Sequence, residues 1–137
     1  MNKKYIGIGV FIIAIVALLA FSGGARTQEL SGASFMETYQ KTAGAVLLDV
    51  RTPGEFASGH LEGALNVDFN NPTFSEEMQK LDKEKPYFVY CRSGNRSGQA
   101  IAMMKNGGFK NLVELQGGIV SNQGALTLVT TIGAQQN

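Results

Sequence analysis

A single cysteine stands where the chain is best suited to covalent chemistry. Cys91 is the only cysteine among the 137 residues, and it directly follows the apolar run Tyr87–Tyr90. A Ser- and Gly-containing loop with two arginines comes next: Arg92, Ser93, Gly94, Asn95, Arg96 and Ser97. A short loop that opens a helix aims several backbone N–H groups at one point, and helix N-termini and cations lower the pKa of a thiol. The segment 91–97, called the Cys91 loop below, therefore predicts a cradle for a thiolate, a persulfide or an oxyanion.

Plainer interpretations of this loop stay open from the residues alone. Cys91 would also fit as a small buried hydrophobe at the end of a strand. Arg92 and Arg96 would also fit as solvated surface charges. A metal site is not expected, because one cysteine and one histidine are too few for the usual zinc ligand sets.

A second group of polar residues follows another apolar run. Asp49 stands at the end of that run, and Arg51 comes two residues later. In the next segment, Thr52-Pro53-Gly54-Glu55, the spacing of Thr and Glu is typical of a capping box, and Pro suits the first helical position. We expect a short helix here that ends near Gly59, directly before His60.

These motifs resemble, in order and spacing, those of single-domain members of the rhodanese family of sulfurtransferases. Leu48–Phe56, Gly59–Ala64 and Asn66–Val67 are similar to the family's amino-terminal signature, and the Cys91 loop is similar to its active-site loop. Gly107–Phe109 and Gly117–Ile119 extend the likeness, which covers roughly residues 28–129. The resemblance implies a rhodanese-like α/β fold and a sulfurtransferase activity.

The mechanism that the resemblance implies runs through a covalent intermediate. The Cys91 thiolate would take a sulfane sulfur from a donor such as thiosulfate or a persulfide, and the loop amides would hold the Cys91 persulfide. A thiol or a cyanide-like acceptor would then attack the outer sulfur. Arg92 and Arg96 would attract anionic donors and stabilise departing charge, and no metal or organic cofactor is implied. The alternative is a persulfide carrier or binding module without significant turnover.

The resemblance also implies roles for the amino-terminal motif. Asp49 and Arg51 would be supporting residues that pair and fix the fold near the site, with direct contact with the substrate as the alternative. His60 would make a structural hydrogen bond in a turn rather than act as a general base, since a thiolate that is already formed needs none.

Two further comparisons with family patterns sharpen these expectations. Related phosphatases with a Cys nucleophile have five residues between the Cys and the Arg, whereas four separate Cys91 from Arg96, which favours a ring of amides sized for one sulfur atom. The family usually has a Trp where this chain has Asn122, so the C-terminal helix is expected to be shorter or to pack differently at the rim of the pocket.

Alternating strands and helices are expected to position these residues. Apolar runs predict strands near residues 45–50, 64–67, 87–90 and 112–115. Ser34-x-x-Glu37 predicts a capping box, Phe74, Met78 and Leu81 predict one helix face, and Ser97, Ala100, Ile101 and Met104 predict another. The alternation predicts an α/β fold with a mostly parallel central sheet and helices on both of its faces.

Composition and charge limit the classes of partner. With 44% hydrophobic and 17% charged residues, the chain is expected to form one globular domain, at residues 27–131, followed by a polar tail at 132–137. Its 12 Lys and Arg against 11 Asp and Glu leave no basic excess, so nucleic acid is not an expected partner.

Residues 1–26 predict a signal peptide or a transmembrane anchor that forms an N-terminal hydrophobic helix. Lys3 and Lys4 precede an uncharged apolar stretch, 5–25, which is long enough for the roughly 20 residues that span a bilayer. An uncleaved anchor is slightly favoured, although Gly23-Gly24-Ala25 would also serve as a cleavage site. Either segment would put the domain outside the cytoplasm. Arg26–Leu30 is expected to be a short tether that keeps the active site near the membrane surface.

Overall fold

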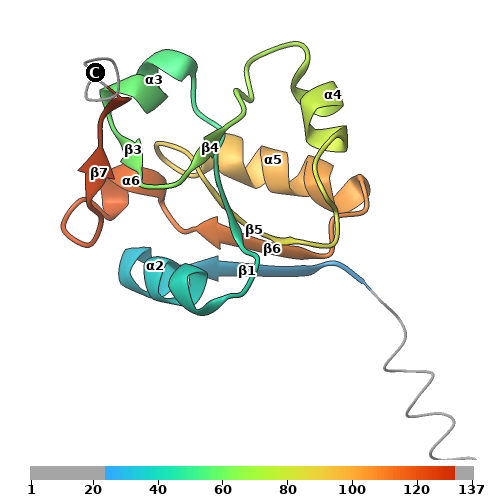
Figure 1. The fold of residues 1–137 in the computed structure, drawn as a ribbon, viewed down its shortest axis with the longest axis horizontal. Coiled ribbons are helices and arrows are strands. Elements are labelled where there is room, and N and C mark those ends of the chain that lie inside the picture. The colour runs from blue at the N-terminus through green and yellow to red at the C-terminus, as the bar shows by residue number, and fades with distance from the viewer. Residues whose placement is uncertain (1–23, 132–137) are drawn as a thin grey trace, which may run out of the picture.

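Five parallel strands form the central sheet of the computed structural model, which describes residues 24–131 (Figure 1). Their order is β1-β6-β5-β2-β4. The bounds in chain order are β1 Arg26–Leu30, β2 Val46–Asp49, β4 Leu65–Asn66, β5 Pro86–Tyr90 and β6 Asn111–Leu115. Two short strands, β3 His60–Leu61 and β7 Leu128–Val129, form a separate antiparallel pair. The predicted α/β fold with a mostly parallel sheet is confirmed.

Helices cover both faces of this sheet (Figure 1). They are α2 Gly32–Lys41, α3 Pro53–Ser58, α4 Phe74–Gln79, α5 Asn95–Asn106 and α6 Gly118–Ser121. One face packs against Met78 of α4 and Met104 of α5, and the other against Phe35 of α2 and Ile119 of α6. Because both faces are covered, the central strands β2 and β5 are apolar on both sides, which explains the hydrophobic runs 46–48 and 87–90.

The segment expected to be a tether is an edge strand. Arg26–Leu30 pairs in parallel with Asn111–Leu115, so Arg26 belongs to the folded unit rather than to the N-terminal segment. The tether prediction was wrong because this strand carries polar side chains and is exposed over most of its length, so no apolar pattern marks it. Its stability comes from pairing with β6, which the local sequence does not show.

Helix α2 begins before the predicted capping box. It starts at Gly32, with Ser31 as the N-cap, and Ser34 lies within the helix. The side chain of Asn122, which lies 90 residues away in the sequence, accepts a hydrogen bond from the Gly32 N–H at 2.8 Å. This tertiary contact satisfies one of the N–H groups that a helix leaves free at its start, in the way that a local cap would.

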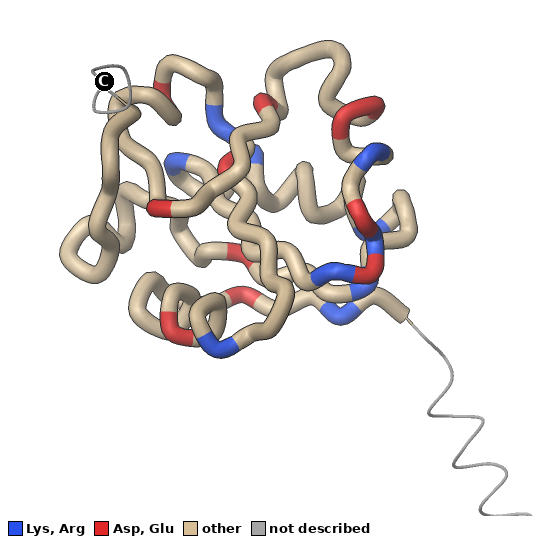
Figure 2. The backbone as a smooth tube through the Cα atoms, viewed as in Figure 1, with Lys and Arg blue, Asp and Glu red and all other residues tan. Residues whose placement is uncertain are grey.

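The predicted N-terminal hydrophobic helix falls almost entirely on residues 1–23, which lie outside the described residues, as does the polar tail 132–137. Within residues 24–131, no helix has the length and apolar character needed to span a bilayer. Over the same residues, Lys and Arg are interspersed with Asp and Glu along the chain (Figure 2).

Candidate active site

The Cys91 side chain lies at the carboxyl end of β5, inside the loop that joins this strand to α5. Cys91 is buried, with 1% of its surface exposed. The Gly94 N–H donates a hydrogen bond to Sγ at 3.0 Å, and the Cys91 thiol donates to Oγ of Ser97 at 3.4 Å. The structure therefore brings Cys91, Gly94 and Ser97 of the predicted loop together, while Arg92, Ser93 and Asn95 are exposed at its surface.

Two glycines next to Cys91 have backbone conformations in the left-handed region of φ and ψ, which residues with a side chain rarely adopt. Gly94, the N-cap of α5, has φ +99°, and Gly118 at the start of α6 has φ +63°. A Cβ on Gly118 would overlap the Arg92 carbonyl group and lie 2.6 Å from the Ser93 nitrogen. Close backbone approach therefore requires glycine at position 118.

Helix α6 is hydrogen-bonded to the start of the Cys91 loop. The N–H of Ile119 donates to the Cys91 carbonyl at 3.1 Å, and the N–H of Val120 donates to the Arg92 carbonyl at 3.0 Å. These two bonds turn the loop carbonyls toward α6. The arrangement agrees with the anion-binding geometry expected where successive amides converge before a helix.

The environment of Cys91 favours its ionised form. Burial by itself would raise the pKa of the Cys91 thiol, but hydrogen bonds from Ser97, Gly94 and Ser93 outweigh burial and hold the pKa below its ordinary value. A lowered pKa increases the fraction of thiolate, which is the nucleophilic form.

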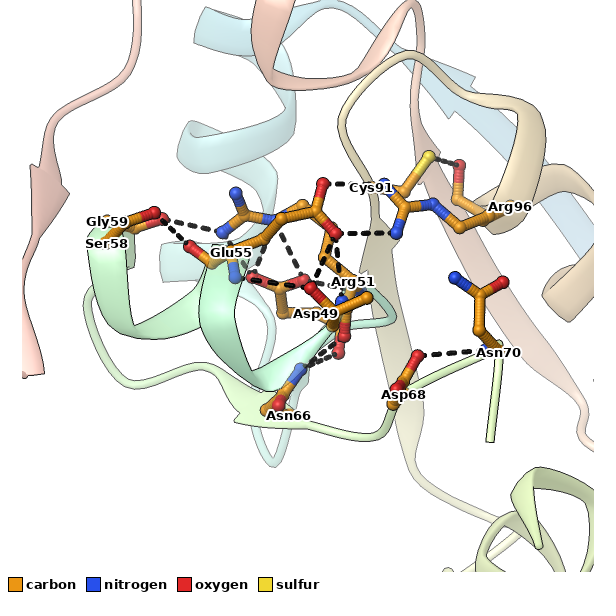
Figure 3. Close-up of polar contacts among 12 residues, drawn as sticks. Asp49, Arg51, Glu55, Ser58, Gly59, Asn66, Asp68, Asn70, Cys91 and Arg96 are labelled. Atoms are coloured by element: carbon orange, nitrogen blue, oxygen red, sulfur yellow. Dashed lines mark hydrogen bonds and ion pairs between the residues drawn. The ribbon is translucent and has the colours of Figure 1, made fainter. Parts of the chain in front are cut away.

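Arg96 is held by a carboxylate on a different helix (Figure 3). Its two terminal nitrogens donate to the two oxygens of Glu55, at 2.7 and 2.8 Å. The hydrogen bonds from Arg96 lower the pKa of the Glu55 carboxyl to about 2. Arg96 was expected to attract anionic donors, and its pairing with Glu55, which the sequence did not predict, compensates much of its charge.

The role of Glu55 in this pair was missed from the sequence, where it was recognised only as part of a capping box. That capping box is confirmed: the Glu55 N–H donates to Thr52 Oγ1, and the Thr52 N–H donates to Oε2 of Glu55. The same carboxylate thus fixes the start of α3 and connects it to α5. Sequence alone gives no sign of a contact between residues 41 positions apart.

The expected pair of Asp49 and Arg51 is present and buried (Figure 3). Nη2 of Arg51 donates to Oδ2 of Asp49 at 2.7 Å, and Nε donates to Oδ1 at 3.0 Å. Nη2 also donates to the Gly59 carbonyl at 2.6 Å, and the guanidinium lies 5.7 Å from the centre of the Tyr90 ring. The pair thus connects the end of β2 to the turn after α3.

His60 is the first residue of β3, directly after the turn that ends α3, and forms the type of contact expected there. Its Nδ1 lies 2.8 Å from the Phe56 carbonyl oxygen, and its ring stacks on Phe56 with the ring centres 3.7 Å apart. Both contacts are local, which agrees with the structural interpretation of His60. Within the described residues, no group of three or more His, Cys, Asp and Glu side chains could hold a metal ion.

Asn122 ends α6 at the position where a Trp was expected. Its Nδ2 donates to the carbonyls of Gln116 and Gly118, both at 2.8 Å, while its Oδ1 accepts from Gly32. Helix α6 spans only Gly118–Ser121. A polar side chain here connects α6 to the start of α2.

A family model described as a rhodanese-like domain matches residues 33–125, which include the Cys91 loop and the Asp49–Arg51 pair. This chain belongs to the family of rhodanese-like domains. The resemblance seen in the sequence motifs is therefore confirmed at the level of the family.

Several curated relatives carry names that describe an activity. A protein named sulfurtransferase from Allochromatium vinosum is 32% identical over 68% of this chain and 85% of its own length. Thiosulfate sulfurtransferase GlpE from Stutzerimonas stutzeri is 36% identical over 57% of this chain and 70% of its own length. The chain also matches probable adenylyltransferase/sulfurtransferase MoeZ from Mycobacterium tuberculosis, a much longer protein, over only 19% of that protein's length at 39% identity.

Solved structures resemble the fold of this chain. The crystal structure of a rhodanese-related protein from Thermoplasma volcanium superimposes with a TM-score of 0.65 at 27% identity, covering 74% of this chain and 97% of the other.

Proposed function

We propose that the domain is a sulfurtransferase that carries a sulfane sulfur on Cys91. The observation that carries this proposal is the position of Sγ, which receives the Gly94 N–H at 3.0 Å in a loop closed by α5 and α6. The names of curated relatives support the same activity. Donor amides directed at Sγ stabilise a thiolate before transfer and a persulfide anion after it.

The first half-reaction loads the enzyme. The Cys91 thiolate attacks the outer sulfur of thiosulfate, a new S–S bond forms, and sulfite leaves with the electron pair of the broken bond. In the second half-reaction, a thiolate or cyanide attacks the outer sulfur of the persulfide, and Cys91 is released as a thiolate. Both half-reactions balance without a metal or an organic cofactor.

The two loop arginines differ in what they can offer the donor. Arg96 is bonded to Glu55, and Arg92 is exposed at the surface of the loop. Arg92 is therefore proposed to meet the anionic donor, while Arg96 holds the loop against α3.

The test is a steady-state assay of sulfur transfer from thiosulfate to cyanide, with Cys91→Ser as the matched variant. We expect turnover by the native domain and none above background by Cys91→Ser. Loading of sulfur without turnover would instead identify a persulfide carrier, and equal rates for both proteins would contradict a role for Cys91.

We also propose that the apolar stretch 5–25 anchors the domain on the outer side of the cytoplasmic membrane. The apolar stretch after Lys3 and Lys4 supports this proposal. Arg26 begins β1 level with Pro86 of β5, whereas Cys91 follows the other end of β5. Five residues of strand span about 17 Å, so the Cys91 loop would lie on the side of the domain away from the bilayer.

The placement is tested by fractionating cells of the native host and adding protease to intact spheroplasts. An anchored domain outside the cytoplasm stays with the membranes and is digested without lysis. A soluble protein that starts at Arg26 would show a cleaved signal instead, and protection until lysis would contradict the outward orientation.

A further inference from the structure

A carboxylate that the sequence analysis did not single out lies behind the Cys91 loop. Oγ of Ser97 donates to Oε1 of Glu114 at 2.6 Å, while the Cys91 thiol donates to the same Oγ at 3.4 Å. Ser97 is fully buried, and its hydroxyl joins the sulfur to the carboxylate in one continuous chain of hydrogen bonds. The short bond to Glu114 is of the charge-assisted kind.

Glu114 is placed for this contact by its strand and by two glycines. It lies in β6 between the buried residues Val113 and Leu115, and its side chain reaches the start of α5. A Cβ on Gly98 would lie 3.6 Å from Oε1 of Glu114, and one on Gly94 would lie 4.0 Å away. The absence of side chains at these two positions leaves space for a carboxylate under the loop.

We propose that Glu114 is the proton acceptor for Cys91 and acts on it through Ser97, an inference that rests on the proposed sulfurtransferase function. When the thiol ionises, its proton passes to Ser97 Oγ, and the hydroxyl proton of Ser97 passes to Oε1 of Glu114. The product is a thiolate that accepts a hydrogen bond from Ser97, beside a neutral carboxyl that donates to Ser97. The reverse transfer returns the proton when the acceptor releases Cys91 from its persulfide.

The surroundings of Cys91 and Glu114 bring the pKa of the thiol and the pKa of the carboxyl closer together. Burial raises the pKa of the Glu114 carboxyl, and the charge of Glu29, its neighbour on β1, raises it further against the effect of the Ser97 hydrogen bond. The pKa of Cys91 is lowered by its hydrogen bonds. The positive charge of Arg96 on α5 also interacts with the Cys91 thiolate. On the other neighbouring strand, β5, the residue beside Glu114 is the uncharged Val89.

A shared proton changes how thiolate forms with pH. Two coupled groups titrate in two steps that belong to the pair, and between these steps the pair holds one proton. The thiolate fraction is then set by the distribution of that proton and changes little with pH. Ionising both groups is disfavoured because it places two negative charges on either side of one hydroxyl.

The test is the rate at which iodoacetamide alkylates Cys91, the only cysteine, between pH 4.5 and pH 9. The native protein should show a shallow middle region between two rising steps. Glu114→Gln keeps an acceptor for Ser97 but removes the charge, so we expect one step, about tenfold per pH unit, with a lower midpoint. At pH 7.5 this variant should react about three to ten times faster than the native protein.

Ser97→Ala and Glu84→Gln complete the experiment. Ser97→Ala removes the connection and a donor to the sulfur, so it should give one step with a higher midpoint, opposite in direction to Glu114→Gln. Glu84 pairs with Lys110 at the surface, and Glu84→Gln should reproduce the native profile. A profile for Glu114→Gln that is identical to the native one, or slower throughout, would overturn the proposal. Alkylation needs no sulfur donor, so its outcome is independent of whether the domain turns over thiosulfate.

Discussion

From the ion pair between Glu55 and Arg96 we predict how much the free energy of unfolding falls when Glu55 is replaced by Gln. In Glu55→Gln the charge is lost, while the side chain can still occupy its place in the capping box. The fall in the pKa of Glu55 from 4.5 to about 2 corresponds to at most about 3.4 kcal/mol at neutral pH. Because the Glu55 and Arg96 side chains are 30% and 20% exposed, solvent screening reduces the expected loss to about 2 kcal/mol.

The pH dependence of this loss follows from the direction of the pKa shift. A carboxyl whose pKa is lowered by folding contributes fully above its unfolded pKa, near 4.5, and the contribution fades as pH falls toward 2. We therefore expect Glu55→Gln to lower the free energy of unfolding by about 2 kcal/mol at pH 7 and by under about 1 kcal/mol at pH 3.

Urea unfolding of the native protein and the variant at both pH values measures these differences. Glu37→Gln is the matched control, because Glu37 pairs with Lys41 on an exposed surface of α2, and its loss should cost less than about 0.5 kcal/mol. Equal destabilisation by Glu55→Gln at pH 7 and pH 3, or none at pH 7, would refute the assignment of the pair.

Three further substitutions test the residues that hold the Cys91 loop in place. Asp49→Asn leaves its buried arginine partner without a counter-charge and should cost about 3–5 kcal/mol in urea unfolding, and a loss under 1 kcal/mol would argue against the pair's importance. Gly118→Ala forces a Cβ into the loop backbone and should lower both the unfolding midpoint and sulfur transfer; Gly124→Ala, with open space around it, should change neither. Arg96→Ala should lower turnover more than Lys105→Ala, which lies near the other end of α5; equal losses would show that position in the loop is unimportant.

The parts of the fold that the sequence predicted are those with a local signal. The apolar runs that became β2, β5 and β6 are buried on both faces, and the capping box of α3 is complete within four residues. Strand β1 was missed because Arg26–Leu30 is polar and exposed, and its only support is a partner more than 80 positions away. The start of α2 was missed for a similar reason, since its cap, Asn122, lies 90 positions away in the sequence.

In the site, too, residues close together in the sequence could be assigned, whereas contacts between distant residues could not. Cys91, Gly94 and Ser97 could be assigned because they share one short loop before a helix. The partners of that loop, Glu55 and Glu114, come from α3 and β6, and their contacts exist only in the folded chain. Glu114 did give one local signal, because it is a charged residue between the apolar residues Val113 and Leu115.

The most direct test of the account is the intact mass of the protein after incubation with thiosulfate and removal of small molecules. A persulfide on Cys91 predicts a gain of one sulfur atom, about 32 Da, on the native chain and no gain on Cys91→Ser. The added mass should disappear when cyanide is supplied. An unchanged native mass, or the same gain on both proteins, would contradict the central claim that Cys91 carries the transferred sulfur.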